Sequence, residues 1–172
     1  MSVTGEYLGM GLSVPENDEH NLAYFRYCAE HDFRLQKCSS CDLLHYPPTT
    51  GCPFCMGAES EWVSVEGKGE VHSYGEVHHA IQPAWKDHTP YLFLLVDLDT
   101  QKDEPTEHDA LRILANLVTE DGQPAPQDQV KLVGIGTRVR MVFADAGEGI
   151  SIPQFAIDEE AQQPTPWRYP QE

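Results

Sequence analysis

The spacing of apolar and polar side chains predicts one helix near the N-terminus. Residues 17–31 have helical periodicity, and their apolar positions i, i+3 and i+7 are Leu22, Phe25 and Ala29. Asn17 or Asp18 is expected to cap this helix, because a short polar side chain accepts a hydrogen bond from the first free backbone N–H groups. Acidic residues follow in the first turn, where the helix dipole favours them.

The second half of the chain alternates with the two-residue period of strands. Strands are predicted at residues 62–65, 70–77, 91–98, 111–118, 138–143 and 151–157. The run 91–98 is almost continuously apolar, which indicates a strand buried on both faces, whereas 111–118 also fits a helix. Gly67 and Gly69 interrupt the first strand pattern and suggest a bulge or a sharp coil there.

The remaining segments lack periodicity. Residues 1–15 are predicted to form an extended arm that either docks on a partner or is disordered; its apolar members are Tyr7, Leu8, Met10 and Leu12. Residues 99–109 and 120–129 are acidic or proline-bearing and are predicted loops. The tail 158–172 is polar and rich in proline, and we expect it to be mobile.

Five or so strands joined by turns marked with Gly and Pro favour a small barrel over βαβ units. A partly open five-stranded Greek-key barrel of the OB type is the natural solution. The predicted fold is therefore mainly β, with an N-terminal helix, a cysteine-bearing module and a five-stranded OB-fold barrel. The predicted divisions are 1–32 (arm and helix), 33–60 (cysteine module), 61–157 (barrel) and 158–172 (mobile acidic tail).

Charge and composition narrow the classes of partner. The 172 residues include 11 basic and 28 acidic side chains, a net charge of −17, and 40% are hydrophobic, as in a globular chain. Such a chain repels nucleic-acid phosphates and anionic lipid headgroups. No apolar run is long enough to span a bilayer, and the N-terminus lacks the basic and apolar regions of a secretory signal. We therefore expect no membrane association and a cytoplasmic location.

Two C-x-x-C pairs carry the strongest chemical signal in the chain: Cys38 with Cys41, and Cys52 with Cys55. Two residues between thiolates let a tight turn direct both sulfur atoms at one ion, and four thiolates complete a tetrahedron around Zn²⁺. Such a metal stabilises a module that is too small to carry a core of its own. Because four cysteines close the coordination shell, the predicted zinc is structural.

Other readings of the cysteines stay open. The pairs are also compatible with two disulfides or a redox C-x-x-C, although reducing conditions in the cytosol oppose these. Thiolate ligands accept iron as well as zinc. His45 is placed where it can replace one thiolate. The fifth cysteine, Cys28, lies beside the helical stripe and is expected to be a small buried hydrophobe.

In this setting the sequence resembles a known family: acyl-CoA-associated proteins that combine a rubredoxin-like zinc ribbon with an OB-fold domain. The resemblance covers residues 20–157. The residues that carry it are Phe25, 33–38, Cys41, Tyr46-Pro47-Pro48, 52–55, Trp62, 67–69, 71–74, 90–91, 96–98, 135–136, Val139 and 153–155. The sequence departs from the family pattern in the N-terminal arm, in an acidic insertion near 101–109 and in the polar tail.

The resemblance implies an accessory role. Similar proteins pair with thiolase-like enzymes, which are either thiolases or aldolases that cleave a β-hydroxyacyl-CoA, as in steroid side-chain breakdown. The catalytic residues of those assemblies belong to the thiolase-like chain, so none is expected here. The implied function is a non-catalytic subunit that stabilises such a partner and helps form its acyl-CoA site, with structural zinc and a shared acyl-CoA ligand.

Basic residues near the cysteines are candidates for contacts with coenzyme A. Lys37 and Lys68 are the predicted contacts for its phosphates, because Gly67 and Gly69 allow backbone to approach a phosphate beside Lys68. Arg26 and Arg34 are the other basic residues of this region, and ordinary solvated charges remain the alternative.

Catalysis by this chain alone would rest on histidines. His72, His78 and His79 fall near the end of the first barrel strand, where a histidine pair can act as acid and base. No carboxylate or nucleophile accompanies them at motif spacing, so surface or hydrogen-bonded histidines are the simpler interpretation.

A stand-alone module that binds acyl-CoA or nucleic acid is the alternative function. Zinc ribbons and OB folds bind nucleic acid elsewhere, and Tyr74, Trp85 and Tyr91 are the aromatic residues that would stack on bases. The net charge of −17 opposes phosphate, and the basic residues form no stripe. No nucleic-acid partner is therefore expected.

Overall fold

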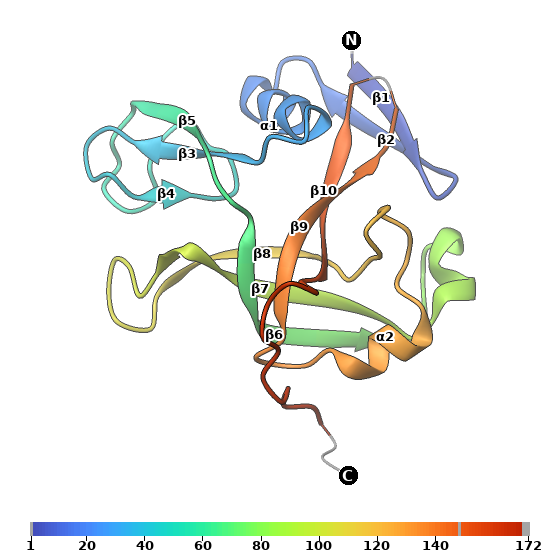
Figure 1. Ribbon diagram of the computed structural model, residues 1–172. Helices are drawn as coiled ribbons and strands as arrows, with labels where there is room; N and C mark the ends of the chain where they lie inside the picture. The colour runs from blue at the N-terminus through green and yellow to red at the C-terminus, as the bar shows by residue number, and fades with distance from the viewer. Residues whose placement is uncertain (1, 148, 170–172) are drawn as a thin grey trace.

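The computed structural model describes residues 2–147 and 149–169 (Figure 1). Along the chain it contains β1 (Ser2–Tyr7), β2 (Met10–Pro15), α1 (Glu19–Ala29), β3 (Arg34–Cys38), β4 (Leu44–His45), β5 (Ser60–Ser64), β6 (Lys68–Val77), the 3₁₀ helix η1 (Pro83–His88), β7 (Tyr91–Lys102), β8 (Ala110–Asn116), α2 (Gln127–Leu132), β9 (Arg138–Asp145) and β10 (Ser151–Ile157). Among the described residues, neither α-helix has the length and apolar character that crossing a bilayer requires.

Five strands form the barrel in the order β10-β9-β6-β7-β8, with antiparallel neighbours throughout. The two outer strands approach each other through a parallel bridge between Leu117 and Phe155, which nearly closes the barrel. The predicted mainly-β fold with a five-stranded OB-type barrel is therefore confirmed. Residues 110–116 form a strand, which excludes the helix alternative for this segment.

The barrel core is built from one face of each strand. Leu92, Leu94, Val96 and Leu98 of β7 are fully buried, while Phe93 on the opposite face is 42% exposed. The expectation that this strand is buried on both faces is therefore wrong. A single sheet closed on itself has an outer surface, and over Phe93 the described chain leaves that surface open to solvent.

The glycine pair at the start of β6, with Gly67 just before the strand and Gly69 within it, has a different role from the predicted bulge. A Cβ on Gly69 would lie 2.4 Å from the carbonyl oxygen of Asp97, so the residue permits close approach of β7. Gly67 has φ = +74°, a conformation that favours glycine. The register shift itself falls between Val71 and Ser73.

Helix α1 begins where the sequence predicts. The side chain of Asp18 accepts a hydrogen bond from the backbone N–H of Asn21 at 3.2 Å, which satisfies one free donor of the first turn. Its buried side chains are Leu22, Tyr24 and Cys28. Of the predicted stripe, Leu22 is buried, whereas Phe25 and Ala29 are half-buried. The buried face is therefore rotated relative to the stripe, because the helix packs against several strands, among them β10, β3 and β2 (Figure 1).

The N-terminal segment is a β-hairpin and differs from the predicted loose arm. β1 pairs with β2, and the N–H of Glu6 donates to the carbonyl of Ala146 beside the barrel. Tyr7 is buried against Trp85, and its hydroxyl donates to the carbonyl of Gly122 at 2.9 Å. The apolar side chain of Tyr7 thus packs within this chain.

The strand at residues 60–64 belongs to the ribbon sheet, which has the order β4-β3-β5. Leu35 pairs with Val63, and Gln36 pairs with Trp62. The sequence placed Trp62 at the start of a barrel strand, because its alternation runs into β6 with only a short interruption. Periodicity identifies a strand and leaves its pairing partner open.

The tail was expected to be mobile, and the described part instead lies along the barrel. Trp167 and Ile135 exchange two backbone hydrogen bonds of 2.9 Å. The side chain of Gln163 donates to the carbonyl of Arg138 and accepts from its N–H. Helix α2, within and just after the segment predicted as loop, supplies part of the surface beneath the tail (Figure 1).

The ribbon and the barrel share one apolar core. Leu35 and Leu44 of the ribbon belong to the same buried cluster as Val96 and Leu98 of β7. At its edge the buried side chain of Gln101 accepts from the N–H of Leu44 at 2.7 Å and donates to its carbonyl at 3.0 Å. This pair of bonds joins the short ribbon strand β4 to the end of β7.

We predict that Gln101→Leu lowers the free energy of unfolding by about 3 kcal/mol, because a buried N–H and a buried carbonyl lose their partners. Urea unfolding followed by circular dichroism measures the change. Gln127→Ala is the matched control, since the Gln127 amide also donates to backbone carbonyls but is exposed. Its expected cost is below about 1 kcal/mol, and an equal loss in both variants would contradict the prediction.

Candidate metal centre

The two C-x-x-C pairs form turns with the same hydrogen bonds. In the first, Asp42 N–H donates to the carbonyl of Cys38 at 3.0 Å; in the second, Met56 N–H donates to the carbonyl of Cys52 at 2.9 Å. Asp42 and Met56 have φ of 62° and 64°, so each turn closes through one left-handed residue directly after its second cysteine.

This shared geometry brings the four sulfur atoms together. They all lie within 4.8 Å of one another. Sγ of Cys38 is 3.6 Å from Sγ of Cys55, and Sγ of Cys41 is 3.7 Å from Sγ of Cys52. A zinc ion with Zn–S bonds of about 2.3 Å requires tetrahedral edges of about 3.8 Å. The four predicted ligands therefore fit tetrahedral Zn²⁺.

The electrostatics of the cluster favour a bound cation. The backbone N–H groups of Ser40 and Cys41 lower the pKa of the Cys38 thiol to about 6. The N–H of Leu43 acts in the same direction at Cys41, but burial and hydrogen bonds with the other thiols raise the pKa of Cys41 to about 12. The other thiols thus favour ionisation of Cys38 and oppose that of Cys41, whereas a zinc ion deprotonates each thiol that binds it.

Gly57 gives the cluster its tight packing, and the sequence analysis did not single it out. A Cβ at this position would lie 3.2 Å from Sγ of Cys38 and 2.9 Å from Oγ of Ser40. Its carbonyl also accepts from the N–H of Cys52 at 2.8 Å. The available signal was its position, a glycine two residues after the last cysteine of the motif.

His45 lies outside the metal-ligand cluster. Its ring is buried, with Nδ1 3.4 Å from the hydroxyl of Thr49, and burial lowers its pKa. It does not join the group of four sulfur atoms that can hold an ion. The alternative in which His45 replaces one thiolate is therefore not supported. Cys28 is fully buried in the core, and burial raises its pKa to about 12.

The two lysines predicted to contact coenzyme A lie in separate hollows. Lys37 is 3.2 Å from the carboxylate of Asp42, beside the first cysteine turn. Lys68 is 3.5 Å from the carboxylate of Glu66 and lines a polar hollow with Arg140. The structure thus does not bring them into one site, and their role stays a prediction.

The histidines of the first barrel strand have carboxylate partners that motif spacing did not reveal. Nδ1 of His72 is 3.1 Å from the carboxylate of Asp97, and Nε2 of His78 is 3.2 Å from that of Glu76. Asp97 is shared with Arg112, whose Nε lies 2.7 Å away. Both histidine side chains are exposed and contact carboxylates, as the simpler interpretation of hydrogen-bonded surface histidines expects.

The aromatic side chains considered for base stacking pack within the chain. Trp85 is buried between Tyr7 and Tyr91. The ring of Tyr74 lies beneath the guanidinium of Arg168, 5.3 Å from its centroid. These rings do not form a shared exposed platform.

Two adjoining family profiles match the chain, and the boundary between them falls within β5. The profile for the ChsH2 rubredoxin-like zinc ribbon domain matches residues 25–61. The profile for the ChsH2 C-terminal OB-fold domain matches residues 62–144. The two matches adjoin and together include the metal cluster and most of the barrel.

Similar proteins are subunits of acyl-CoA enzymes. The chain is 32% identical over 101 residues to the benzoylsuccinyl-CoA thiolase subunit BbsA of Thauera aromatica, covering 59% of this chain and 61% of that protein. It is 28% identical over 141 residues to a probable enoyl-CoA hydratase alpha subunit of Thermomonospora curvata, covering 82% of this chain and 38% of that protein. The chain thus spans less than two thirds of either relative.

A solved structure resembles the whole arrangement. A chain of the Ltp2-ChsH2(DUF35) aldolase superposes with a TM-score of 0.63 at 26% sequence identity. The match covers 84% of this chain and 98% of the other.

We predict that the purified protein contains one zinc ion per chain and that Cys38→Ser loses it. A structural zinc site contributes on the order of 10 kcal/mol to folding, so the variant and chelator-treated wild type should both melt at a lower temperature. Elemental analysis and thermal unfolding measure the two effects. Less than one zinc per chain, together with an unchanged melting temperature for Cys38→Ser, would contradict the structural role.

A second prediction concerns the packing of Gly57. Gly57→Ala should weaken zinc binding about tenfold, because the new methyl group crowds a sulfur atom that the metal holds in place. Gly51→Ala is the control, since its Cβ would meet only the carbonyl oxygen of Gly57, at 3.8 Å. Competition with a chromophoric chelator gives both affinities. Equal affinities for the two variants would show that Gly57 has no special role.

Proposed function

Because the chain belongs to the family that joins a ChsH2-type rubredoxin-like zinc ribbon to an OB-fold domain, we propose that it is a non-catalytic subunit of a thiolase-like acyl-CoA enzyme. In this role it stabilises the partner subunit and helps form the acyl-CoA site. The partner is a thiolase or a retro-aldolase, and steroid side-chain degradation is one setting for the latter.

The relatives carry this proposal. One is named as a thiolase subunit, and another forms part of an aldolase whose matching chain is covered over 98% of its length. A shared ribbon and barrel in proteins of both kinds supports a common accessory role. Thiolysis and retro-aldol cleavage both break a carbon–carbon bond in an acyl-CoA, so one accessory fold suits both.

The metal site supports a non-catalytic role. Catalytic zinc keeps an open coordination position for water or substrate, whereas four thiolates fill the tetrahedron. Cys38 and Cys52 are buried while Cys41 is half-buried and Cys55 exposed, so the closed shell rests on the four thiolates and not on burial. A bound zinc would therefore hold the ribbon together. Thiolate ligands need reducing conditions, which supports the predicted cytoplasmic location.

A role in the acyl-CoA site is the finer part of the proposal. Lys37 and Lys68 are its candidate phosphate contacts, and both are partly exposed. Their present partners, Asp42 and Glu66, are exposed carboxylates, and such surface pairs contribute little stability. A phosphate can replace either carboxylate at small cost.

The hydratase-subunit relative favours a second candidate function. It matches 82% of this chain, yet the match covers only 38% of its own length. The same ribbon and barrel are thus part of a longer protein with a different enzyme name. An accessory role beside an enoyl-CoA hydratase is therefore the second candidate, whereas no comparable observation favours a stand-alone acyl-CoA or nucleic-acid module.

We predict that this chain co-purifies with the thiolase-like protein encoded in the same gene cluster when the two are co-expressed. The complex should cleave acyl-CoA substrates, and omission of this chain should lower specific activity at least tenfold. Cleavage that consumes free coenzyme A indicates thiolysis, whereas cleavage without it indicates retro-aldol chemistry.

The control is the same partner co-expressed with Cys38→Ser, which tests whether a folded ribbon is needed. If the two wild-type chains do not co-purify and activity is unchanged without this chain, the subunit proposal fails.

A further inference from the structure

The C-terminal segment builds an exposed apolar surface together with the region around α2. We call it the strap surface; its members are Leu132, Ile135, Pro164, Pro166, Trp167 and Tyr169. Leu132 is 65% exposed, Trp167 45% and Tyr169 78%. In the described part of the chain, nine large hydrophobic side chains are exposed, and four of them belong to this surface. Such clustering is typical of an interaction site.

Residues 163–169, which we call the strap, are held against the barrel by hydrogen bonds, so the strap surface is formed before any partner binds. One guanidinium nitrogen of Arg168 donates to the carbonyls of Val130 and Val133 at 2.5 and 2.6 Å. The other guanidinium nitrogen pairs with Glu76. The N–H of Tyr169 donates to the hydroxyl of Tyr74 at 3.0 Å. A preformed surface spares a partner the entropic cost of ordering it.

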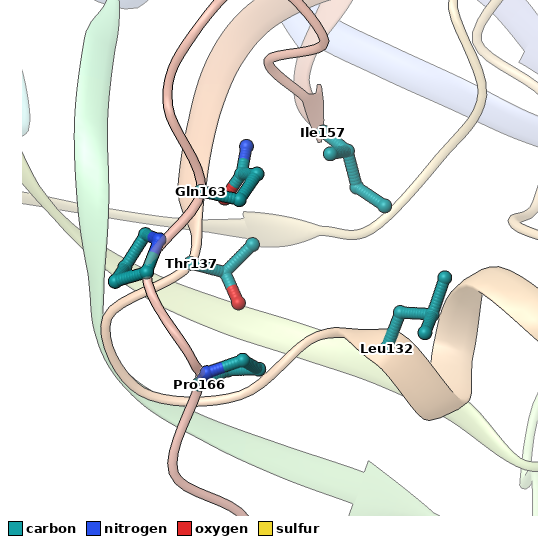
Figure 2. A pocket seen from close by; sticks show the side chains of 6 residues that line it. Leu132, Thr137, Ile157, Gln163 and Pro166 are labelled. Carbon is teal, nitrogen blue, oxygen red and sulfur yellow. The ribbon is translucent and has the colours of Figure 1, made fainter.

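Strap residues also line a hollow of about 240 Å³ next to the barrel (Figure 2). Figure 2 shows the side chains of Leu132, Ile157, Pro166 and Thr137 around this space. Its walls are mostly apolar. Sites for drug-sized ligands begin at about 300 Å³. The hollow therefore suits one bulky side chain of a protein partner better than a cofactor.

The charge around the strap surface is acidic. Asp128 lies one helical turn before Leu132, and Glu159 and Glu160 follow Ile157; all three are exposed. Glu159 and Glu160 line a polar hollow with Lys68 and Arg140. The nearby cations are paired with carboxylates: Lys68 with Glu66, Arg138 with Asp99, Arg140 with Glu120 and Arg168 with Glu76. Lys131 is exposed on α2. A complementary partner segment therefore carries basic residues beside its apolar anchor.

We propose that the strap surface docks the thiolase-like partner subunit, through a segment with one bulky apolar side chain flanked by Lys or Arg. This inference rests on the proposed function and names the surface through which it acts. The anchor fills the hollow, Trp167 and Leu132 pack around it, and the basic residues face Glu159 and Glu160. The strap follows β10, beyond residues 62–144, which the OB-fold profile matches.

The test measures the affinity of full-length variants for the thiolase-like protein of the same gene cluster. Leu132→Asp and Trp167→Ala should each raise Kd at least tenfold, because a central apolar contact is lost. Glu159→Gln with Glu160→Gln should raise Kd a few-fold and reduce its dependence on salt. Both apolar positions are exposed, so melting temperatures should stay close to wild type.

The matched control is Ile81→Asp, which changes an 88% exposed apolar side chain outside the strap surface and adds the same charge. Its Kd should stay within twofold of wild type. If wild type binds and both Leu132→Asp and Trp167→Ala stay within twofold, the docking surface is wrong while the subunit function stands. If wild type does not bind, the proposed function fails and this inference fails with it.

Discussion

The side chains of Leu35 and Leu44 extend from the zinc ribbon into the same apolar core as Val96 and Leu98 of the barrel. The ribbon is too small to bury a core of its own, so it needs a constraint at each end. The four sulfur atoms provide one at the outer end, and the shared core provides the other. Gln101 completes the junction by satisfying both backbone groups of Leu44.

This double constraint gives the proposed accessory role a structural basis. Helix α1 packs against both the ribbon strand β3 and the barrel strand β10, so the modules form one body (Figure 1). The ribbon and its residue Lys37 therefore have a fixed position relative to any partner that binds the barrel. Such preorganisation matters for a subunit that completes a site, because loose elements lose affinity to ordering.

The sequence predicted those features that depend on residues close together along the chain. The cysteine spacing identified the metal ligands, and Asn17 or Asp18 marked the start of α1. Alternation and the apolar run 91–98 located barrel strands, with 111–118 left open between strand and helix. Pairing was harder, since the strand at 60–64 joins the ribbon through contacts with β3, far away in the sequence. The polar segment containing Gln101 read as a loop because its buried partner, Leu44, lies 57 residues earlier.

The structure of the two ends of the chain was also not predicted from the sequence, for the same reason: contacts with distant residues hold them. Both lie outside residues 25–144, which the family profiles match, and both looked unstructured from their composition. Each is nevertheless held by backbone hydrogen bonds and one long polar side chain: Tyr7 reaches the carbonyl of Gly122, and Arg168 reaches those of Val130 and Val133. These anchors bind main-chain carbonyls, which every residue type provides. The ends of the chain are therefore held at the surface without demands on the side chains of the core, which suits the accessory role proposed for this chain.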